Sequence, residues 1–238
     1  MPPLLVLNPN TSTAVTQMLL QHLRGSEADV SPAPWLGCTA AWGAPYIADE
    51  RSYCIAGHAV LDAWERAQAR APVEGFGGVL IGCFGDPGLE ALREIAPVPV
   101  WGLAEASLHA LWAQGPQRVA IVTGGLKWQH MLERWCRMHG YGTPAPATGC
   151  CVGGVHALEA SGGQMMQSPD AAVLALGAAC TQALVGGGCD AVLLGGAGLA
   201  GMGARVRAVT GLPVWDCVEL VRRPGALHRT GASAATVA

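Results

Sequence analysis

The sequence predicts an α/β fold with two similar lobes, on three observations. Residues 79–81 and 192–194 are short apolar runs of the kind found in parallel strands buried on both faces. Hydrophobic residues make up 51% of the chain and charged residues only 13%, which favours a large buried core over disorder. The third observation is an internal repeat that includes both apolar runs.

The repeat relates the two halves of the chain. Residues 78–88 recur as residues 191–201, 113 positions later. Val98-Pro99-Val100-Trp101 recurs as Leu212-Pro213-Val214-Trp215, 114 positions later. In this register Cys83 of the first half corresponds to Gly196 of the second half, so the halves differ where one carries a thiol.

The elements of the first half follow from apolar runs and turn signals. Strands are expected at residues 4–7, near Val30, at 79–81 and at 98–101. Helices are expected from the turn at 8–12 to about 24, over 50–70, from 86 to 95, and around Glu105 and His109. Residues 38–47 are expected to form a loop that lines a pocket.

Cys83 is expected at the carboxyl end of a strand, with a helix starting at once. Asp86 suits the cap of that helix and Pro87 its first position. A thiol at the positive end of a helix is favoured as thiolate, and the same place binds anions. The polar turn at residues 8–12 is explained equally well by helix capping and by ligand binding.

The second half repeats this plan after a hinge at residues 114–117. Strands are expected at 118–122, 190–194 and 212–215, and helices after the turn at 123–125, over 169–185, after Gly196 and from Asp216. Residues 150–154 are expected to form a glycine-rich loop, 169–185 a buried helix rather than a membrane span, and the tail from Thr230 a frayed end.

Charge and cysteine usage exclude several classes of function. The net charge is −3 without a basic stripe, which argues against nucleic acid and membrane surfaces as partners. The nine cysteines are scattered and no secretory signal is visible, so we expect cytoplasmic free thiols, with neither a disulfide framework nor a metal site. A small-molecule ligand fits this composition better.

The sequence resembles the aspartate/glutamate racemase superfamily, and within it the hydantoin and allantoin racemases. The stretches that carry this resemblance span nearly the whole chain: residues 7–12, 39–47, 56–59, 82–88 (Gly-Cys-Phe-Gly-Asp-Pro-Gly), 102–106, 122–124 and 213–216.

This resemblance implies two pseudo-twofold-related lobes, each a mainly parallel sheet flanked by helices, with the active site in the cleft between them. Lobe 1 would comprise residues 1–103 plus 217–238, and lobe 2 residues 104–216. It also implies cofactor-independent proton transfer at an acidic Cα–H next to a carbonyl, by one cysteine on each face. The expected partner is such a small molecule, at best a 5-substituted hydantoin, and the expected assembly is a homo-oligomer.

The resemblance also assigns roles to individual residues. Cys83 matches the first catalytic cysteine, and Gly196 falls where the second belongs. Some substrate-binding positions are assigned by their match to the family and others by their place in the expected pocket. These positions are Asn8, Tyr46, Phe84, Gly85, Thr123, Gly124 and Ala197.

Glycine at position 196 has no proton to give, and three explanations are open. Cys217 or Cys189 could serve the second face. A single thiol could suffice for another reaction, as in arylmalonate decarboxylase, a relative whose one cysteine lies in the second half. The glycine could also be an introduced substitution. A decarboxylase or isomerase is therefore the alternative enzyme, and a binding protein that has lost racemase chemistry is the alternative outside catalysis.

Overall fold

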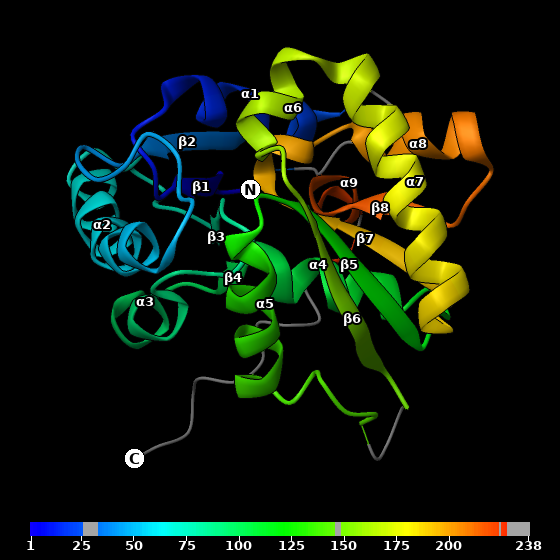
Figure 1. Ribbon diagram of the computed structural model, residues 1–238. Helices are drawn as coiled ribbons and strands as arrows, with labels where there is room; N and C mark the ends of the chain where they lie inside the picture. Colours follow the sequence, from blue (N-terminus) through cyan, green and yellow to red (C-terminus); the bar gives the residue numbers. More distant parts are fainter. Residues whose placement is uncertain (26–32, 146–148, 224, 228–238) are drawn as a thin grey trace. The chain divides into compact units, whose positions relative to one another are not determined.

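The computed structural model describes residues 1–25, 33–145, 149–223 and 225–227, and it divides into two compact units (Figure 1). Unit 1 consists of Met1–His109 and Val221–Ala238, and unit 2 of Ala110–Leu220. The division falls within helices α4 (Leu103–Trp112) and α9 (Cys217–Arg222), whereas the sequence placed the lobe boundaries at the start of each.

Each unit contains a four-stranded sheet in which every strand pair is parallel, as the sequence predicted. The strand order in unit 1 is β2-β1-β3-β4, formed by β1 (Leu4–Asn8), β2 (Trp35–Thr39), β3 (Gly78–Ile81) and β4 (Val100–Gly102). The order in unit 2 is β6-β5-β7-β8, formed by β5 (Arg118–Gly124), β6 (Cys151–Leu158), β7 (Ala191–Gly195) and β8 (Val214–Asp216). The internal repeat therefore corresponds to two sheets of one topology.

The topology of each sheet points to one place for a ligand. The first strand of each unit lies between the second and the third, so the direction of winding reverses beside it. Ligands of open parallel sheets bind outside the carboxyl ends of the strands at such a switch point. In unit 1 this point lies between β1 and β3, and in unit 2 between β5 and β7.

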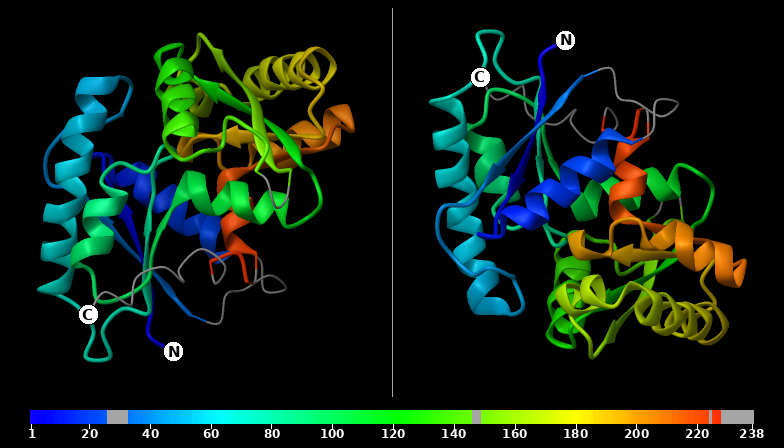
Figure 2. Two further views of the ribbon diagram at one scale, coloured as in Figure 1. Left: turned by 90° about the horizontal axis from the view of Figure 1, so that it is seen from below. Right: turned by 90° about the horizontal axis from the view of Figure 1, so that it is seen from above.

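Helices cover both faces of the sheet in unit 1. These helices are α1 (Thr13–Arg24), α2 (Glu50–Gln68), α3 (Leu89–Ile95) and the start of α4. Figure 2 shows α2 and α3 on one face and α1 on the other. Buried side chains of α2, such as Val60 and Trp64, join Leu5, Leu7 and Val79 of the sheet in one apolar core.

Unit 2 is layered in the same way. Its helices are α5 (Lys127–Met138), α6 (Gly162–Gln167), α7 (Pro169–Gly187), a 3₁₀ turn η2 (Ala197–Leu199), α8 (Met202–Thr210) and the start of α9. Figures 1 and 2 show the strands between α5 and α7. Leu176 of α7 and Val206 of α8 pack with Val122 and Leu194 of the sheet.

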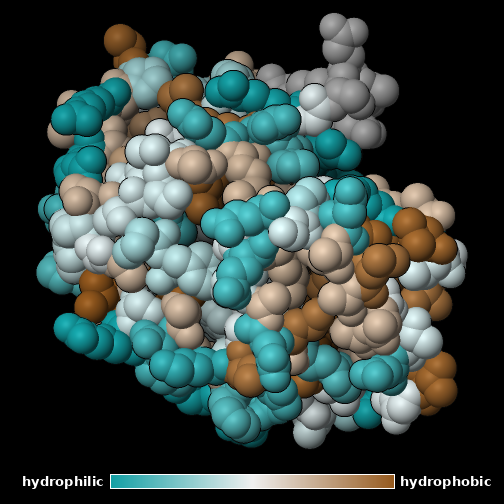
Figure 3. All heavy atoms as spheres, turned by 45° about the horizontal axis from the view of Figure 1, so that its top comes forward, coloured by the Kyte–Doolittle hydropathy of each residue, from teal (hydrophilic) through white to brown (hydrophobic). Residues whose placement is uncertain are grey.

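Helix α7 is long and apolar enough to cross a membrane by length and composition. It nevertheless packs against β5, β6 and β7, and Leu176, Cys180 and Ala183 are fully buried there, as expected for a core helix. Its outer side exposes Leu174 and Val185, and Figure 3 shows apolar side chains gathered over the region of α7.

Three sequence expectations differ from the structure. Cys38 and Thr39, expected in the loop 38–47, instead end strand β2, because they pair in register with Leu7 and Asn8 of β1. Residues 151–154, expected in a glycine-rich loop, instead begin strand β6, and a Cβ at Gly153 would lie 2.6 Å from Cys189 Sγ. The short helix α6 was not anticipated. The strand expected near Val30 and the frayed end from Thr230 lie outside the described residues.

Candidate active site

Cys83 lies at the switch point of unit 1, directly beyond the carboxyl end of β3. The Gly82 N–H donates a 2.7 Å hydrogen bond to the Leu7 carbonyl, which holds the start of the turn against β1. Only 8% of Cys83 is exposed. The thiol therefore lies at the edge of the sheet that topology selects for ligands, as the sequence predicted.

The turn after Cys83 is more elaborate than the sequence indicated. Helix α3 begins only at Leu89, and its cap is Gly88 in the left-handed conformation, with no side-chain hydrogen bond. The expectation that Asp86 caps this helix, with Pro87 at its first position, is therefore wrong. Cys83 is also not at a helix N-terminus, because the backbone instead makes a tight turn with φ of 119° at Gly85 and 56° at Asp86.

This turn presents backbone N–H groups that have no internal acceptor. The Asp86 N–H bonds to the Cys83 carbonyl at 3.1 Å. Among the described residues, however, nothing accepts a hydrogen bond from the N–H of Phe84 or of Gly85. Two such donors next to a thiol are suited to stabilise an oxygen anion that forms beside it.

Tyr53 of α2 fixes this turn from the other side. Its hydroxyl donates a 2.5 Å hydrogen bond to the Gly85 carbonyl. Helix α2 can approach this closely because Gly57 and Gly88 meet without side chains: a Cβ at Gly88 would lie 2.7 Å from the Gly57 carbonyl oxygen. Sequence reasoning missed Tyr53, since no local signal connects it to a turn 32 residues away.

The Asn8 turn, beside Cys83 at the same sheet edge, is organised internally. Asn8 is fully buried, and its amide nitrogen lies 2.9–3.0 Å from Asn10 Oδ1, the Ser12 carbonyl and Thr16 Oγ1. Its Oδ1 accepts from the Asn10 N–H. Ser12 caps α1, which confirms the capping interpretation of this turn. A contact between Asn8 and substrate stays a prediction.

The loop 40–47 adjoins the Asn8 turn, since the Thr11 N–H donates to the Ala44 carbonyl. Tyr46 in this loop is half-buried. Trp42 is exposed and its ring meets that of His58 edge to face, with centroids 4.7 Å apart. The loop therefore supplies aromatic side chains to unit 1 near the Asn8 turn, while Tyr46 as a substrate contact stays a prediction.

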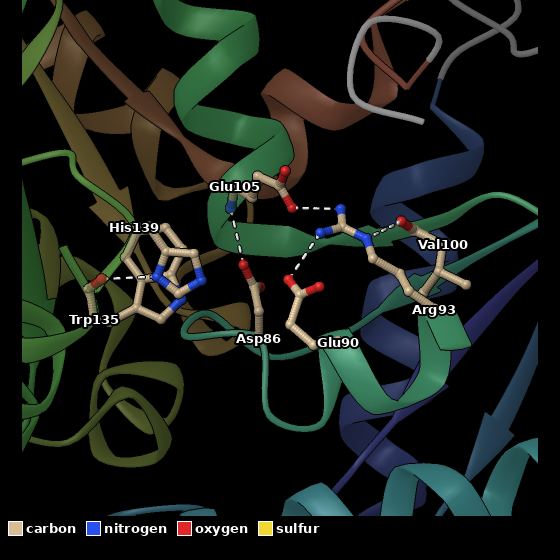
Figure 4. A network of polar contacts seen from close by, with 7 residues as sticks. All are labelled: Asp86, Glu90, Arg93, Val100, Glu105, Trp135 and His139. Carbon is tan, nitrogen blue, oxygen red and sulfur yellow. Dashed lines mark hydrogen bonds and ion pairs between the residues drawn. The ribbon is translucent and has the colours of Figure 1, made fainter. Parts of the chain in front are cut away.

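A network of charged groups supports the Cys83 turn (Figure 4). The buried carboxylate of Asp86 accepts hydrogen bonds from the N–H groups of Ala104 at 2.8 Å and Glu105 at 3.0 Å, in the first turn of α4. Arg93 of α3 lies between Glu105 at 2.6 Å and Glu90 at 3.1 Å. Burial raises the pKa of Asp86 to about 7, although the two N–H groups and Arg93 lower it.

Gly196 lies at the corresponding place in unit 2, beyond β7, with φ of 144°. Glycine adopts this conformation freely and other residues rarely do. A Cβ built there would have space, because its nearest neighbours would be Leu199 Cγ at 3.7 Å and Thr123 Oγ1 at 3.9 Å. Thr123 therefore lies beside position 196, and its contact with substrate stays a prediction.

The turn of unit 2 also presents unused donors. Among the described residues, no acceptor faces the N–H of Ala197 or of Gly198, or the hydroxyl of Thr123. Gly124 is required by close packing on α6, since a Cβ there would lie 2.7 Å from the Ala160 carbonyl oxygen. The turn can therefore donate hydrogen bonds but offers no thiol.

Cys217 and Cys189 are both poor replacements for a thiol at position 196. Cys217 is fully buried, and burial followed by the charge of Asp216 raises its pKa, although a hydrogen bond with the Gly196 backbone lowers it. Cys189 precedes β7, so it lies at the amino edge of the sheet. The whole length of β7, about 16 Å, separates it from Gly196 at the other edge.

Unit 2 holds its turn with a carboxylate too, but from the other direction. Asp216, at the end of β8, accepts hydrogen bonds from the N–H groups of Gly201 at 3.1 Å and Gly203 at 3.3 Å, and from Glu219 in α9 at 2.9 Å. Asp216 therefore orients the backbone of the turn and of the start of α9. Arg207 pairs with Glu219 in this unit as Arg93 pairs with Glu105 in unit 1.

Metal groups and hollows outside the two turns give no second candidate in the described residues. In the described part of the chain, no three His, Cys, Asp or Glu side chains are grouped to hold a metal ion. Unit 2 has a hollow of about 590 Å³ at the start of α7. It is lined by Glu159, Ala160, Gln164, Met165, Ser168, Ala171, Ala172 and Ala175. Neither turn contributes to this lining, so the hollow is separate from the predicted site.

Comparison with known proteins agrees with this geometry. The family model described as Asp/Glu/Hydantoin racemase matches residues 4–222. The chain belongs to the Asp/Glu/hydantoin racemase family. A hydantoin racemase from Paenarthrobacter aurescens is 27% identical to this family member over 222 residues, which are 92% of this chain and 88% of the relative.

Solved structures of the family show the same fold. The allantoin racemase from Klebsiella pneumoniae matches with a TM-score of 0.79 and 27% identity, covering 93% of this chain and 85% of that one. Arylmalonate decarboxylase matches in fold, with a TM-score of 0.62, 19% identity, and coverage of 98% and 94%. The fold is thus shared by racemases and a decarboxylase, so the fold alone does not distinguish these reactions.

Proposed function

We propose that this family member is a cofactor-independent racemase of small cyclic amino-acid derivatives, with a 5-substituted hydantoin as the substrate. Cys83 is its one thiol acid/base. The proposal rests chiefly on Cys83, which lies at the carboxyl end of β3 next to the unpaired N–H groups of Phe84 and Gly85. The hydantoin and allantoin racemases among its relatives support the substrate class.

The reaction follows from these groups. The Cys83 thiolate removes the proton from the carbon between the ring carbonyl and nitrogen, and the electron pair moves into the carbonyl to give an enolate. The N–H groups of Phe84 and Gly85 donate to the enolate oxygen as its charge develops. Return of the proton from Cys83 restores the starting enantiomer, whereas protonation of the other face inverts it.

The glycine at position 196 determines how the second face is served. Residue 196 has no proton to exchange, Cys217 is buried with a raised pKa, and Cys189 lies at the wrong edge. We therefore assign the second proton to solvent water rather than to a protein thiol. Since general acid catalysis contributes about 10²–10⁴-fold, exchange with retention should outpace inversion.

The test follows both enantiomers of a 5-substituted hydantoin in heavy water by proton NMR and optical rotation. Wild-type protein should exchange the Cα proton, and Cys83→Ala should not. Cys54→Ala is the matched control, because Cys54 is an exposed thiol on α2 of the same unit. Exchange that survives in Cys83→Ala contradicts the role of Cys83, and no exchange by wild type rejects the substrate class.

One observation favours a second candidate, a single-thiol decarboxylase. One turn carries a thiol beside unused N–H donors and the other carries donors alone, an arrangement suited to adding one proton to one face after loss of carbon dioxide. A disubstituted malonate with one aromatic substituent is the discriminating substrate. Release of carbon dioxide with a single product enantiomer, and no exchange of hydantoins, would replace the racemase assignment by this one.

A further inference from the structure

Asp86 is the buried charged residue nearest in sequence to Cys83, and its carboxylate joins two segments of unit 1. Residues Cys83 to Asp86 form the turn, closed by the bond from the Asp86 N–H to the Cys83 carbonyl. The Asp86 side chain then leaves the turn and accepts the N–H groups of Ala104 and Glu105. Because β4 leads directly into α4, the residue before the helix is Gly102, which has no side chain to cap it.

The lack of a side chain at Gly102 leaves the space that this carboxylate occupies. A Cβ at Gly102 would lie 2.2 Å from Asp86 Cγ and 2.3 Å from Oδ2. A side chain at position 102 and the carboxylate of Asp86 therefore exclude one another. Asp86 is only 4% exposed, so it occupies this place in the interior rather than at the surface.

Unit 2 also links its turn to the helix after its last strand through a buried carboxylate. There the carboxylate comes from the end of the last strand rather than from the turn. In the repeat register Asp216 corresponds to Gly102, and Leu199 to Asp86. Asp216 caps α9 through the Glu219 N–H and reaches back to the turn through Gly201 and Gly203. Each unit thus has one buried carboxylate between its turn and the helix after its last strand, provided by opposite segments.

The turn of unit 1 needs such a support. Gly85 and Asp86 both have positive φ, at 119° and 56°, and for Asp86 this is a rare conformation. Backbone of this kind persists only where its surroundings hold it. The Tyr53 hydroxyl holds Gly85 from α2, and the Asp86 carboxylate holds the other end of the turn on α4.

We infer that Asp86 is a positioning residue for proton transfer: its carboxylate ties the Cys83 turn to α4 and thereby keeps the thiol and the Phe84 and Gly85 N–H groups in a productive arrangement. This inference rests on the proposed function. Misplacement of a reacting group by about 1 Å can cost about 100-fold in rate, so the loss should fall on kcat rather than on KM.

Protonation adds a readout that a purely structural role would not give. The ionised carboxylate accepts both N–H bonds, whereas a protonated one presents a hydroxyl toward one of them. The charged groups around Asp86 are Glu105 of α4 and Arg93 of α3, which is also paired with Glu90, and the phenol of Tyr53 faces the turn from α2. Since the pKa of Asp86 is raised to about 7, kcat should fall as pH drops through this value.

The experiment compares Asp86→Asn, the double variant Asp86→Ala/Gly102→Asp, and Glu90→Gln. The first replaces one acceptor oxygen by a donor. The second moves the carboxylate to the place it has in unit 2. The third is the matched control, because Glu90 contacts Arg93 in the same network but is 74% exposed and does not touch the turn. Deuterium exchange of a 5-substituted hydantoin is measured from pH 5 to 9, with the thermal midpoint of each variant.

We expect kcat of Asp86→Asn to fall about tenfold or more at pH 8, with KM within about threefold of wild type. The ratio of wild-type to variant kcat should change around pH 7. The double variant should recover most of the lost kcat, and Glu90→Gln should behave as wild type. A folded Asp86→Asn with wild-type kcat, or a folded double variant as slow as Asp86→Asn, overturns the inference.

A substrate-free readout keeps this test separate from the proposed function. Alkylation of individual cysteines by iodoacetamide is followed by mass spectrometry. Release of the turn should expose Cys83 and speed its alkylation in Asp86→Asn, with recovery in the double variant. Cys54 on α2 and buried Cys136 in unit 2 are internal controls and should not change. If wild type exchanges no hydantoin, the proposed function fails, and unchanged Cys83 alkylation in Asp86→Asn then rejects the inference independently.

Discussion

The two units share a strand order, a strand-to-turn junction and a carboxylate that holds the turn, yet only one turn carries a thiol. The Cys83 turn closes with positive φ at Gly85 and Asp86, whereas the Gly196 turn has its unusual φ at the repeat position of the cysteine itself, 144°. At position 196 the backbone of unit 2 therefore has a conformation that favours glycine. The comparison shows that the two turns differ in chemistry: the turn of unit 1 presents a thiol beside N–H donors, and the turn of unit 2 presents donors alone.

The largest effect on proton exchange should come from moving the thiol from unit 1 to unit 2. Cys83→Gly removes the one acid/base and should slow exchange by about 10²–10⁴-fold. The double variant Cys83→Gly/Gly196→Cys moves the thiol to unit 2 and should restore exchange with the opposite enantiomer preferred. Proton NMR in heavy water on each separate enantiomer measures this. The same preference in wild type and the double variant would show that the units do not address different faces.

Gly196→Cys alone should change both the unfolding free energy and the rate of inversion. A side chain fits there, but at φ of 144° it should cost about 1–3 kcal/mol of unfolding free energy. With a thiol in each unit, inversion should accelerate until it equals exchange. Urea denaturation gives the stability and polarimetry gives the inversion rate. Unchanged stability would contradict the glycine-specific backbone, and an unchanged inversion rate would contradict the lack of a second acid/base.

Thr123→Val tests what unit 2 contributes. The hydroxyl of Thr123 would lie 3.9 Å from a Cβ at position 196, and no described residue accepts from it. With Thr123 as the predicted substrate contact, loss of its hydroxyl should lower kcat/KM about tenfold. Thr181→Val on α7 is the matched control, because its hydroxyl bonds only within the helix, to the Gly177 carbonyl. Equal effects of both changes would show that Thr123 acts through stability alone.

A further effect concerns pH and stability rather than the rate of proton exchange. Burial raises the pKa of Asp86 from 3.8 to about 7, so the folded state keeps a proton that the unfolded chain has lost. This contribution is fully present below about pH 4 and is lost as pH rises through about 7. Asp86→Asn should flatten the decline of the unfolding free energy between pH 5 and 8, measured by urea denaturation. An equal decline in the variant would mean that Asp86 ionises normally.

Local patterns predicted the frame of this molecule well. Apolar runs placed β1, β3 and β7, Ser12 marked the start of α1, and the repeat anticipated two sheets of one topology. The place of Cys83 directly after a strand also followed from the sequence. The ends of strands and the caps of helices depend largely on residues that are adjacent in sequence, so local patterns can predict them.

The supports of the site could not be predicted in this way. Asp86 bonds to α4 18 residues further on, and Tyr53 reaches Gly85 across 32 residues. The rule that Asp precedes a helix suggested a local cap, but the space at Gly102 let the side chain cap a different helix. Cys38 and Thr39 were expected in a loop because their strand structure comes from pairing with β1, 31 residues earlier in the chain. Such contacts are determined by tertiary packing, which local patterns do not encode.

In the proposed function one thiol, Cys83, exchanges the proton on one face. Its most direct test is the early time course of wild-type protein with each pure enantiomer of a 5-substituted hydantoin in heavy water, with deuteration and optical rotation recorded together. One enantiomer should gain deuterium with retention, faster than it inverts. Inversion of both enantiomers in step with deuteration, at equal rates, would contradict it and require a second protein acid/base.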